Sequence, residues 1–369
     1  MALNRERMDE LSQPVIEIYN QMQSEMLVRI SRRLAGEIGD SEEISDWEAR
    51  KMEQLNLLTE DNIEVIAEHS GQIREVIRKA LEDIGFEGVQ QNEELFQQAK
   101  KQGADLADPP PPEQSNALLN ILLAYERQAV ERLNLTNSTM LDQSEQVYRD
   151  IINKTAADVT AGTKTSQQAL RDTVRHWAHR GIPALIDSSG REWGAEGYVR
   201  TVIRSTSNNV TNEMQEQRFD EWGQDLVEVS SHMGARPKCA PHQGRIYSRS
   251  GESRRFPAMS STSRGEPDGL FGINCGHVQY PYFPGLSTKR YHPPSKTKND
   301  KAYKNMQRQR KIERDIRNAK TEKRMMEALK DKEGINAANQ RIYNNQAKMR
   351  MFVDDTGRTR RRGREQIYS

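Results

Sequence analysis

The chain has 369 residues, enough for two or three domains, and its composition is unusually polar. Its apolar fraction is 34%, against about 45–50% in typical globular proteins, and 30% of its residues are charged. This balance favours helices with one buried stripe over a large compact α/β core.

No run of eighteen apolar residues occurs, which argues against a membrane-spanning helix. The opening stretch MALNRERMDELSQ lacks the apolar segment of a secretory signal. Two cysteines are too few for a disulfide framework and fit synthesis in a reducing cytoplasm.

The net charge of +1 conceals an asymmetry between two parts of the chain. Residues 1–288 carry 31 Lys and Arg against 44 Asp and Glu, a net charge of −13. Residues 289–369 carry 24 against 10, a net charge of +14. Such a basic end is typical of contact with an acidic partner, most often nucleic acid. A basic helix lying on the protein's own acidic surface, or on an acidic neighbour, explains the same charges, and both interpretations stay open.

The first hundred residues predict helices. Apolar residues recur at steps of three and four along this region, as at Val15, Tyr19, Met22, Met26 and Ile30. The run DPPPP at 108–112 must end any helix, because proline has no amide donor. We therefore expect an N-terminal helical region at 1–107 and a stiff Pro-rich linker at 108–115.

A central helical domain is predicted at 116–224. Its third helix follows Thr165 or Ser166, which can accept the free amides of the first turn, and ends at Gly181. His176 and His179 are three residues apart on that helix and are expected to be ordinary surface side chains. A turn at SSGREWG precedes a helix from about Ala195 to Trp222.

Residues 225–286 predict a small β-rich module, because Gly and Pro become frequent and short strand-like runs appear, DLVEVSSH, GRIYS and HVQYPYF. The polar stretch at 248–272 is expected to be a flexible excursion. Beyond it, 287–369 predicts a basic helical tail of two long charged helices broken near Gly334, ending in a solvated TGRTRRRGREQIYS. The predicted fold is thus mainly α, with multi-helix N-terminal and central regions, a small β-rich Cys/His module and a basic helical C-terminal tail.

The basic tail contains few aromatic residues, so any contact with nucleic acid would be led by charge and sensitive to salt. The side chains predicted to meet nucleic acid or another acidic partner are Arg308, Arg310, Lys311, Arg314, Arg317, Arg358, Arg360, Arg361, Arg362 and Arg364.

Both cysteines of the chain lie in the β-rich module. Cys239-x2-His242 and Cys275-x-His277 supply two thiolates and two imidazoles, the ligand set of a closed tetrahedral zinc site. The site requires a turn at 274–276 that brings Cys275 and His277 to one metal. Zinc is therefore a candidate cofactor, and the sequence contains no phosphate-loop, dinucleotide or zinc-protease motif.

Two other interpretations of the same residues remain. His232, His242 and His277 with Arg236 could form the acid, base and anion clamp of a nuclease, but Asp268 is the one nearby acid. A cysteine nucleophile with a histidine base is also conceivable. Alternatively, His232, Arg236 and His277 bond to backbone carbonyls and tie together a module whose core is thin.

The segments GYVRTVIRSTSNNVTNEMQEQRFDEWGQDLVEVSSHMGARP, HQGRIYS, GINCGHVQYPYFPG, YKNMQRQRKIERDIRNAK and TGRTRRRGREQ, in this order, resemble the phage minor capsid protein 2 family. The resemblance runs from about Thr163 to the C-terminus. Its motif residues here are Arg204, Ser230, His232, Gly234, Arg236, Pro237, Gln243, Gly244, Asn274, Cys275 and His277.

This resemblance implies a structural virion protein of a tailed phage, with no enzymatic role. It implies association with the portal protein at one vertex inside the capsid, after synthesis in the host cytoplasm, and roles in head assembly and in DNA packaging or ejection. The major capsid or scaffolding protein and packaged DNA are further expected partners. The alternatives from other classes are a DNA-acting enzyme and a free DNA-binding protein.

Overall fold

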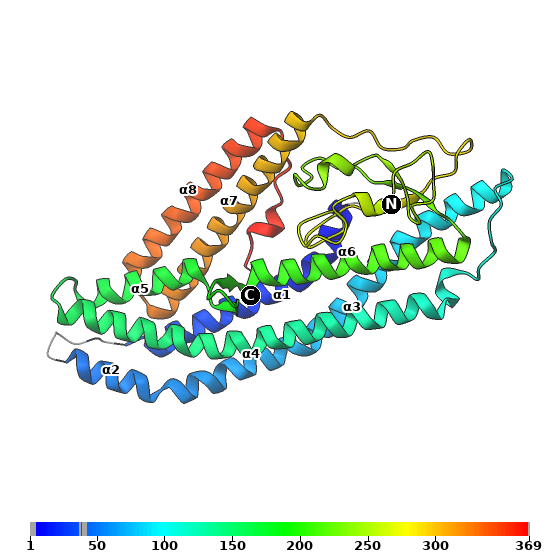
Figure 1. Ribbon diagram of the computed structural model, residues 1–369. Helices are drawn as coiled ribbons and strands as arrows, with labels where there is room; N and C mark the ends of the chain where they lie inside the picture. The colour runs from blue at the N-terminus through cyan, green and yellow to red at the C-terminus, as the bar shows by residue number, and fades with distance from the viewer. Residues whose placement is uncertain (1–4, 37, 39–42, 368–369) are drawn as a thin grey trace. The chain divides into compact units, whose positions relative to one another are not determined.

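A computed structural model describes residues 5–36, 38 and 43–367. The described chain is mainly helical, as predicted (Figure 1). Its α-helices are α1 (Arg5–Leu34), α2 (Ile44–Glu53), α3 (Leu55–Lys101), α4 (Asn116–Thr160), α5 (Ser166–Arg180), α6 (Ala195–Trp222), α7 (Lys296–Leu329) and α8 (Lys332–Thr356). Its strands are β1 (Pro183–Ile186), β2 (Glu192–Gly194), β3 (Leu226–Val229), β4 (Ile246–Ser248) and β5 (Gln279–Pro281). Short 3-10 turns are η1 (Pro112–Gln114), η2 (Ala240–His242), η3 (Met259–Ser261) and η4 (Arg362–Glu365).

The chain divides into two compact units, each assembled from three separate segments. Unit 1 comprises Met1–Val15, Arg74–Arg132 and Arg200–Met306. Unit 2 comprises Ile16–Ile73, Leu133–Val199 and Gln307–Ser369. The five consecutive regions predicted from the sequence were delimited by changes in composition along the chain. These two units are instead delimited by which residues contact one another in space.

Several predicted boundaries are confirmed. The proline run lies between the end of α3 and the start of α4. Thr165 caps α5 in a capping box, because its side chain accepts from the Gln168 amide while the Gln168 side chain accepts from the Thr165 amide. Gly181, with φ +77°, ends that helix in a conformation that favours glycine. The predicted turn before α6 is the connection of a β1–β2 hairpin, which the sequence pattern did not indicate.

The core of unit 1 lies between α3, α6 and a three-stranded antiparallel sheet with strand order β4-β3-β5. Val227 at the centre of β3 pairs with Tyr247 on one side and with Pro281 on the other. The Phe96 ring of α3 stacks on Trp222 of α6, with ring centroids 5.0 Å apart. These side chains are buried together, so the sheet depends on two long helices for its apolar cover.

The stretch 248–272 is not the flexible excursion that its polar composition suggested. Met259 is 2% exposed and Leu270 is fully buried, and both belong to the core that contains Phe96 and Trp222. Ser248 also forms a parallel bridge with Ala258. That prediction was wrong because two widely spaced apolar residues are enough to anchor an otherwise polar loop.

In unit 2, α7 pairs with α8, running in the opposite direction (Figure 1). The contact consists of Ile312 and Ile316 of α7 with Met349 and Phe352 of α8. The two helices break near Gly334, as predicted: α7 ends at Leu329, Lys330 has φ +61°, and α8 begins at Lys332. Gly334 lies inside α8, and a Cβ there would be 2.6 Å from the Met326 sulfur, so the glycine permits close packing.

A buried carboxylate, Glu322 of α7, joins three elements of unit 2. The side chain is fully buried and lies 2.9 Å from both Nε2 of His179 on α5 and Nε of Arg341 on α8. Burial raises the pKa of Glu322, but the hydrogen bonds with His179 and Arg341 outweigh it and hold that pKa below its usual range. His179 is exposed, as expected of a surface side chain, and its ring also contacts α7.

The end of the described chain is docked rather than solvated, contrary to the prediction. Glu365 is 2% exposed and accepts two hydrogen bonds from Arg360, at 2.7 and 2.6 Å. Arg317 of α7 donates to the backbone carbonyl of Arg364. Because these arginines find acceptors within the unit, part of the tail's charge is neutralised by the protein itself.

Candidate metal centre

The loop that carries Cys275 and His277 is held by polar side chains of α6. The Ser205 hydroxyl accepts from the Asn274 amide at 3.1 Å. The Asn208 side chain donates to the Phe271 carbonyl at 3.2 Å, and the Asn212 side chain donates to the His277 carbonyl at 3.3 Å. These bonds place the loop along one side of the helix.

A tight turn then brings Cys275 and His277 together. The Cys275 amide donates to the Gly272 carbonyl at 2.9 Å, and Asn274 has φ +57°, a left-handed conformation that asparagine tolerates well. Both ligand candidates precede β5, which begins at Gln279. The Cys275 sulfur consequently lies 3.2 Å from Nδ1 of His277.

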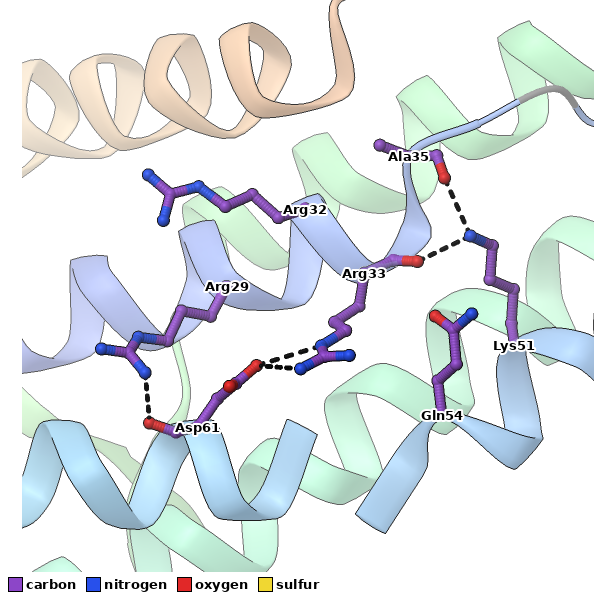
Figure 2. Close-up of a pocket in the computed structure, with 7 residues that line it drawn as sticks. All are labelled: Arg29, Arg32, Arg33, Ala35, Lys51, Gln54 and Asp61. Carbon is purple, nitrogen blue, oxygen red and sulfur yellow. Dashed lines mark hydrogen bonds and ion pairs between the residues drawn. The ribbon is translucent and has the colours of Figure 1, made fainter. Parts of the chain in front are cut away.

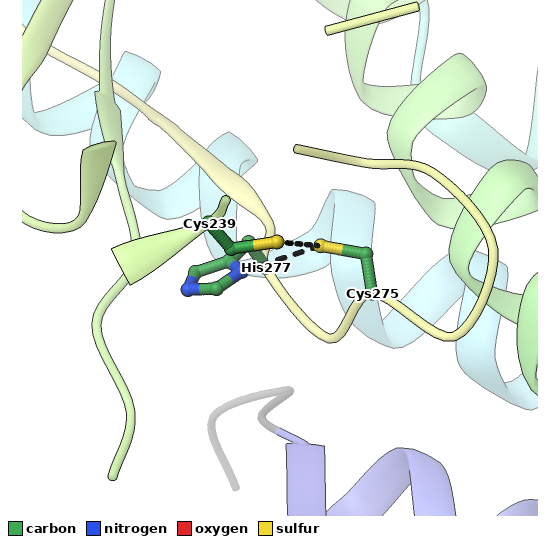
Figure 3. Close-up of side chains that lie close together, drawn as sticks. All are labelled: Cys239, Cys275 and His277. Atoms are coloured by element: carbon green, nitrogen blue, oxygen red, sulfur yellow. Dashed lines mark hydrogen bonds between the residues drawn. The ribbon is translucent and has the colours of Figure 1, made fainter. Parts of the chain in front are cut away.

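Cys239 reaches the same point from a separate loop (Figure 3). Its sulfur lies 4.0 Å from the Cys275 sulfur and 3.4 Å from the Gly269 carbonyl. Arg236 donates to that same carbonyl at 3.2 Å, with its guanidinium 3.8 Å from the Cys239 sulfur. The two thiols are free, since a disulfide would require a sulfur–sulfur distance of about 2.05 Å.

Three of the four predicted metal ligands form one cluster. Ligand atoms of Cys239, Cys275 and His277 all lie within 4.8 Å of one another. The three residues are 1%, 3% and 1% exposed. The fourth, His242, is directed elsewhere: its Nδ1 lies 2.9 Å from the Tyr247 hydroxyl, and its Nε2 accepts from the Ser263 amide at 3.4 Å.

The two cysteines differ in acidity. The hydrogen bond with Cys275, together with burial, raises the pKa of the Cys239 thiol far above its usual range. Burial also opposes ionisation of Cys275, but the hydrogen bond from Cys239 and the charge of His277 hold its pKa well below the ordinary value.

Other residues of the predicted motif build the walls of this centre. Ser230 and Val278 exchange two hydrogen bonds, at 2.9 and 3.0 Å, which fasten the loop after β3 to the His277 loop. The Gln243 side chain accepts from the His232 amide at 2.7 Å. The His232 ring stacks on His277, with centroids 4.3 Å apart.

Most of the remaining motif residues make ion-pair or packing contacts elsewhere in unit 1. Arg204 is buried in α6 and pairs with Asp9 of α1 at 2.9 Å. Gly234 has φ +78° and packs against the backbone near Tyr303, whereas Pro237 is exposed. At Gly244, φ is +60° and a Cβ would lie 2.5 Å from the Tyr291 carbonyl oxygen.

The sequence interpretation missed the side of α6 that supports the centre. Ser205, Asn208, Asn212 and Gln215 recur at steps of three and four, a spacing that places them along one side of a helix. All four are buried. Polar residues at the spacing normally filled by apolar ones were the available signal. The main-chain amide of Phe271 donates to the Cys275 sulfur at 3.2 Å, a contact that no side-chain pattern in the sequence could predict.

Asp268, the one nearby acid considered for a catalytic site, is paired with a lysine. Asp268 lies 2.7 Å from the Lys238 ammonium, and Glu266 contacts the same ammonium at 2.6 Å. The pKa of Asp268 is lowered by that lysine. His242 contacts Tyr247, whereas His232 and His277 stack on each other beside the cysteine cluster.

The predicted basic residues fall into two groups. Those with contacts inside the protein are Arg317 with Glu196, Arg358 with Gln309, Arg360 with Glu365, and Arg310, Arg361 and Arg364. Those with exposed side chains are Arg308, Lys311, Arg314 and Arg362. Arg308 lies over the Phe352 ring, 5.6 Å from its centroid. Both open interpretations of the basic tail thus find support in different residues.

A second concave site lies where α1 ends, and is lined mainly by basic side chains (Figure 2). Lys51 donates to the carbonyls of Arg33 and Ala35 at 2.7 and 2.8 Å, which satisfies the end of the helix. Arg29 and Arg33 are bonded to Asp61. Most of its cations therefore serve contacts within the unit.

Comparison with known proteins gives a consistent result. The family model described as phage minor capsid protein 2 matches residues 3–354. A curated protein named "Structural protein", from Lactococcus phage LL-H, is 30% identical over 328 residues, which is 85% of this chain and 86% of that protein. No solved structure matches significantly. Among the described residues, no helix is long and apolar enough to cross a membrane.

Proposed function

Because this chain belongs to the phage minor capsid protein 2 family, whose members are structural proteins of phage particles, we propose that it binds the portal protein inside the capsid. There it contributes to head assembly and to DNA packaging or ejection, without catalysing a reaction. The observation that carries this proposal is the family match over nearly the whole chain. The contacts of His242 with Tyr247 and of His277 with the Cys275 sulfur give these side chains structural roles, which supports a non-catalytic role.

The portal interaction is tested by co-expressing the chain with the portal protein of the same genome. Size-exclusion chromatography with light scattering should give a complex of defined stoichiometry. The control is the portal protein of an unrelated phage, which should elute separately. A chain that elutes folded and alone in both cases would refute portal association.

Contact with packaged DNA is supported by the exposed basic residues of unit 2. Arg308, Lys311 and Arg314 follow one another at three-residue steps along α7, so they lie on neighbouring positions of one side of the helix. Arg362 adds a further exposed cation. Cations that neutralise phosphates release counterions, so binding should weaken steeply with salt.

Point substitutions test this contact better than removal of 289–369. That deletion would remove Asn299, which exchanges two hydrogen bonds with Ala235, and Glu322 with its buried partners. The slope of log binding constant against log salt concentration is negative. In the triple variant Lys311→Gln, Arg314→Gln, Arg362→Gln its magnitude should decrease by up to about 3.

The matched control replaces three exposed basic residues of the acidic part of the chain, Lys79→Gln, Arg127→Gln and Arg149→Gln. Both triple variants lose the same formal charge, so a difference between their salt slopes shows that the location of the removed charges matters. Equal salt slopes for the two variants would refute a DNA contact through these tail residues. Cleavage of plasmid DNA by the purified chain with a divalent ion would refute the non-catalytic role.

A further inference from the structure

We infer that Cys239, Cys275 and His277 bind one zinc ion, which fastens two loops of unit 1 to each other. This inference is independent of the proposed portal role. Cys239 and Cys275 come from different loops and lie 36 positions apart in sequence.

The distances between the ligand atoms fit a metal. Zinc–sulfur bonds of about 2.3 Å and zinc–nitrogen bonds of about 2.0–2.1 Å at tetrahedral angles place two sulfurs about 3.8 Å apart, and a sulfur and a nitrogen about 3.5 Å apart. The observed distances are 4.0 Å between the sulfurs of Cys239 and Cys275, and 3.2 Å from the Cys275 sulfur to Nδ1 of His277. These two distances differ from the ideal ones by a few tenths of an ångström, and the third pair, the Cys239 sulfur and the His277 ring nitrogen, lies within 4.8 Å.

The surroundings also fit a metal-bound pair of thiolates. The Phe271 amide donates to the Cys275 sulfur at 3.2 Å, and the Arg236 guanidinium lies near the Cys239 sulfur. Donors of this kind stabilise sulfur ligands and orient them. Two thiolates and one neutral imidazole would balance the charge of a divalent ion, and soft sulfur ligands with imidazole favour zinc over magnesium or calcium.

The zinc would stabilise a part of the fold with little apolar core of its own. Asn212 already holds the His277 carbonyl on α6, and Arg236 holds the Gly269 carbonyl beside Cys239. A metal bridge between Cys239 and Cys275 would connect these two anchored points directly. The ion therefore acts as a structural cross-link in a protein made under reducing conditions, where a disulfide does not persist.

The test measures the metal content of the purified full-length chain by inductively coupled plasma mass spectrometry, after size exclusion with a non-chelating reductant. We expect about one zinc per chain. Cys239→Ser, Cys275→Ser and His277→Gln should each lose it. His242→Gln is the matched control, from the same module, and should retain the zinc because His242 contacts Tyr247 instead.

A spectroscopic measurement on the unaltered protein covers the case in which a variant does not fold. Chelator-treated chain titrated with Co²⁺ should develop thiolate-to-cobalt charge-transfer bands and the strong visible absorption of a tetrahedral ion, reversed by added Zn²⁺. Chain that is folded by circular dichroism, carries no zinc and shows no cobalt absorption would overturn the inference. Loss of zinc in His242→Gln with the fold retained would overturn the three-residue assignment.

Discussion

The buried charge cluster of Arg218 allows a quantitative test of what holds unit 1 together. Arg218 is fully buried in α6 and donates two hydrogen bonds to Glu93 of α3 and one to Glu221. The Trp222 indole donates to the same Glu93 carboxylate at 3.1 Å. Glu93→Gln keeps the shape of the side chain but removes its charge and turns an NH₂ group towards these donors.

The expected cost follows from the desolvation of the arginine. Breaking a buried ion pair by changing one partner typically costs about 3–5 kcal/mol, because the other charge stays buried. Glu221 retains one contact with Arg218, and it is 19% exposed in its side chain, so we expect about 3 kcal/mol. For a unit of this size, each kcal/mol lowers Tm by about 2–4 °C, which gives a decrease of roughly 6–12 °C.

The assay is thermal unfolding followed by circular dichroism and by calorimetry at one protein concentration. Glu75→Gln is the control, since Glu75 lies on the same helix and pairs with Arg78 at 2.9 Å with both side chains more than half exposed. Such exposed pairs contribute about 0–1 kcal/mol. The double variant Glu93→Leu, Arg218→Met should recover stability relative to Glu93→Gln, because it leaves no buried charge. Equal Tm values for Glu93→Gln and Glu75→Gln would refute the reasoning.

Two further variants test backbone geometry and pH dependence. Gly244→Ala should lower Tm strongly, because its Cβ would lie 2.5 Å from the Tyr291 carbonyl oxygen. The control Gly190→Ala also has a positive φ but open space around it, so it should cost only conformational strain. Similar losses of Tm in the two variants would contradict the close approach at Gly244. The folded-state pKa of Glu322 is lowered, so the stability it contributes is present above its unfolded pKa of about 4.3 and is lost as pH falls through the folded value. Glu322→Gln should therefore show a shallower fall in Tm between about pH 5 and pH 2 than the unaltered chain. The exposed Glu327→Gln should keep the original slope, and parallel curves for all three proteins would exclude this role.

The sequence predicted the helices well where local chemistry controls their ends. The capping box at Thr165, the glycine at 181 and the proline run after α3 act through backbone donors and dihedral angles within a few residues. Such signals do not depend on distant contacts. The helix break falls near Gly334, at Lys330, whereas Gly334 itself packs against Met326, a contact that local composition does not reveal.

The candidate centre was predicted in part. Residue type and spacing identified Cys239, Cys275 and His277, since thiols and imidazoles in a short Gly-rich module are a recognisable ligand set. His242 was grouped with them on spacing alone, but its hydrogen bond with Tyr247 of β4 directs it elsewhere. Strand pairing decided that orientation, and pairing between residues far apart is not encoded in a local spacing.

The sequence by itself determined the helical class, the polar surface, the charge asymmetry and the family, because each depends on composition or on the order of short motifs. Only the tertiary structure decided which charges are available to a partner. Arg317 and Arg360 pair with the carboxylates of Glu196 and Glu365, whereas Lys311 and Arg314 are exposed, although all four look alike in the sequence. The physical reason is desolvation, since a cation buried in the fold must find its counter-charge there.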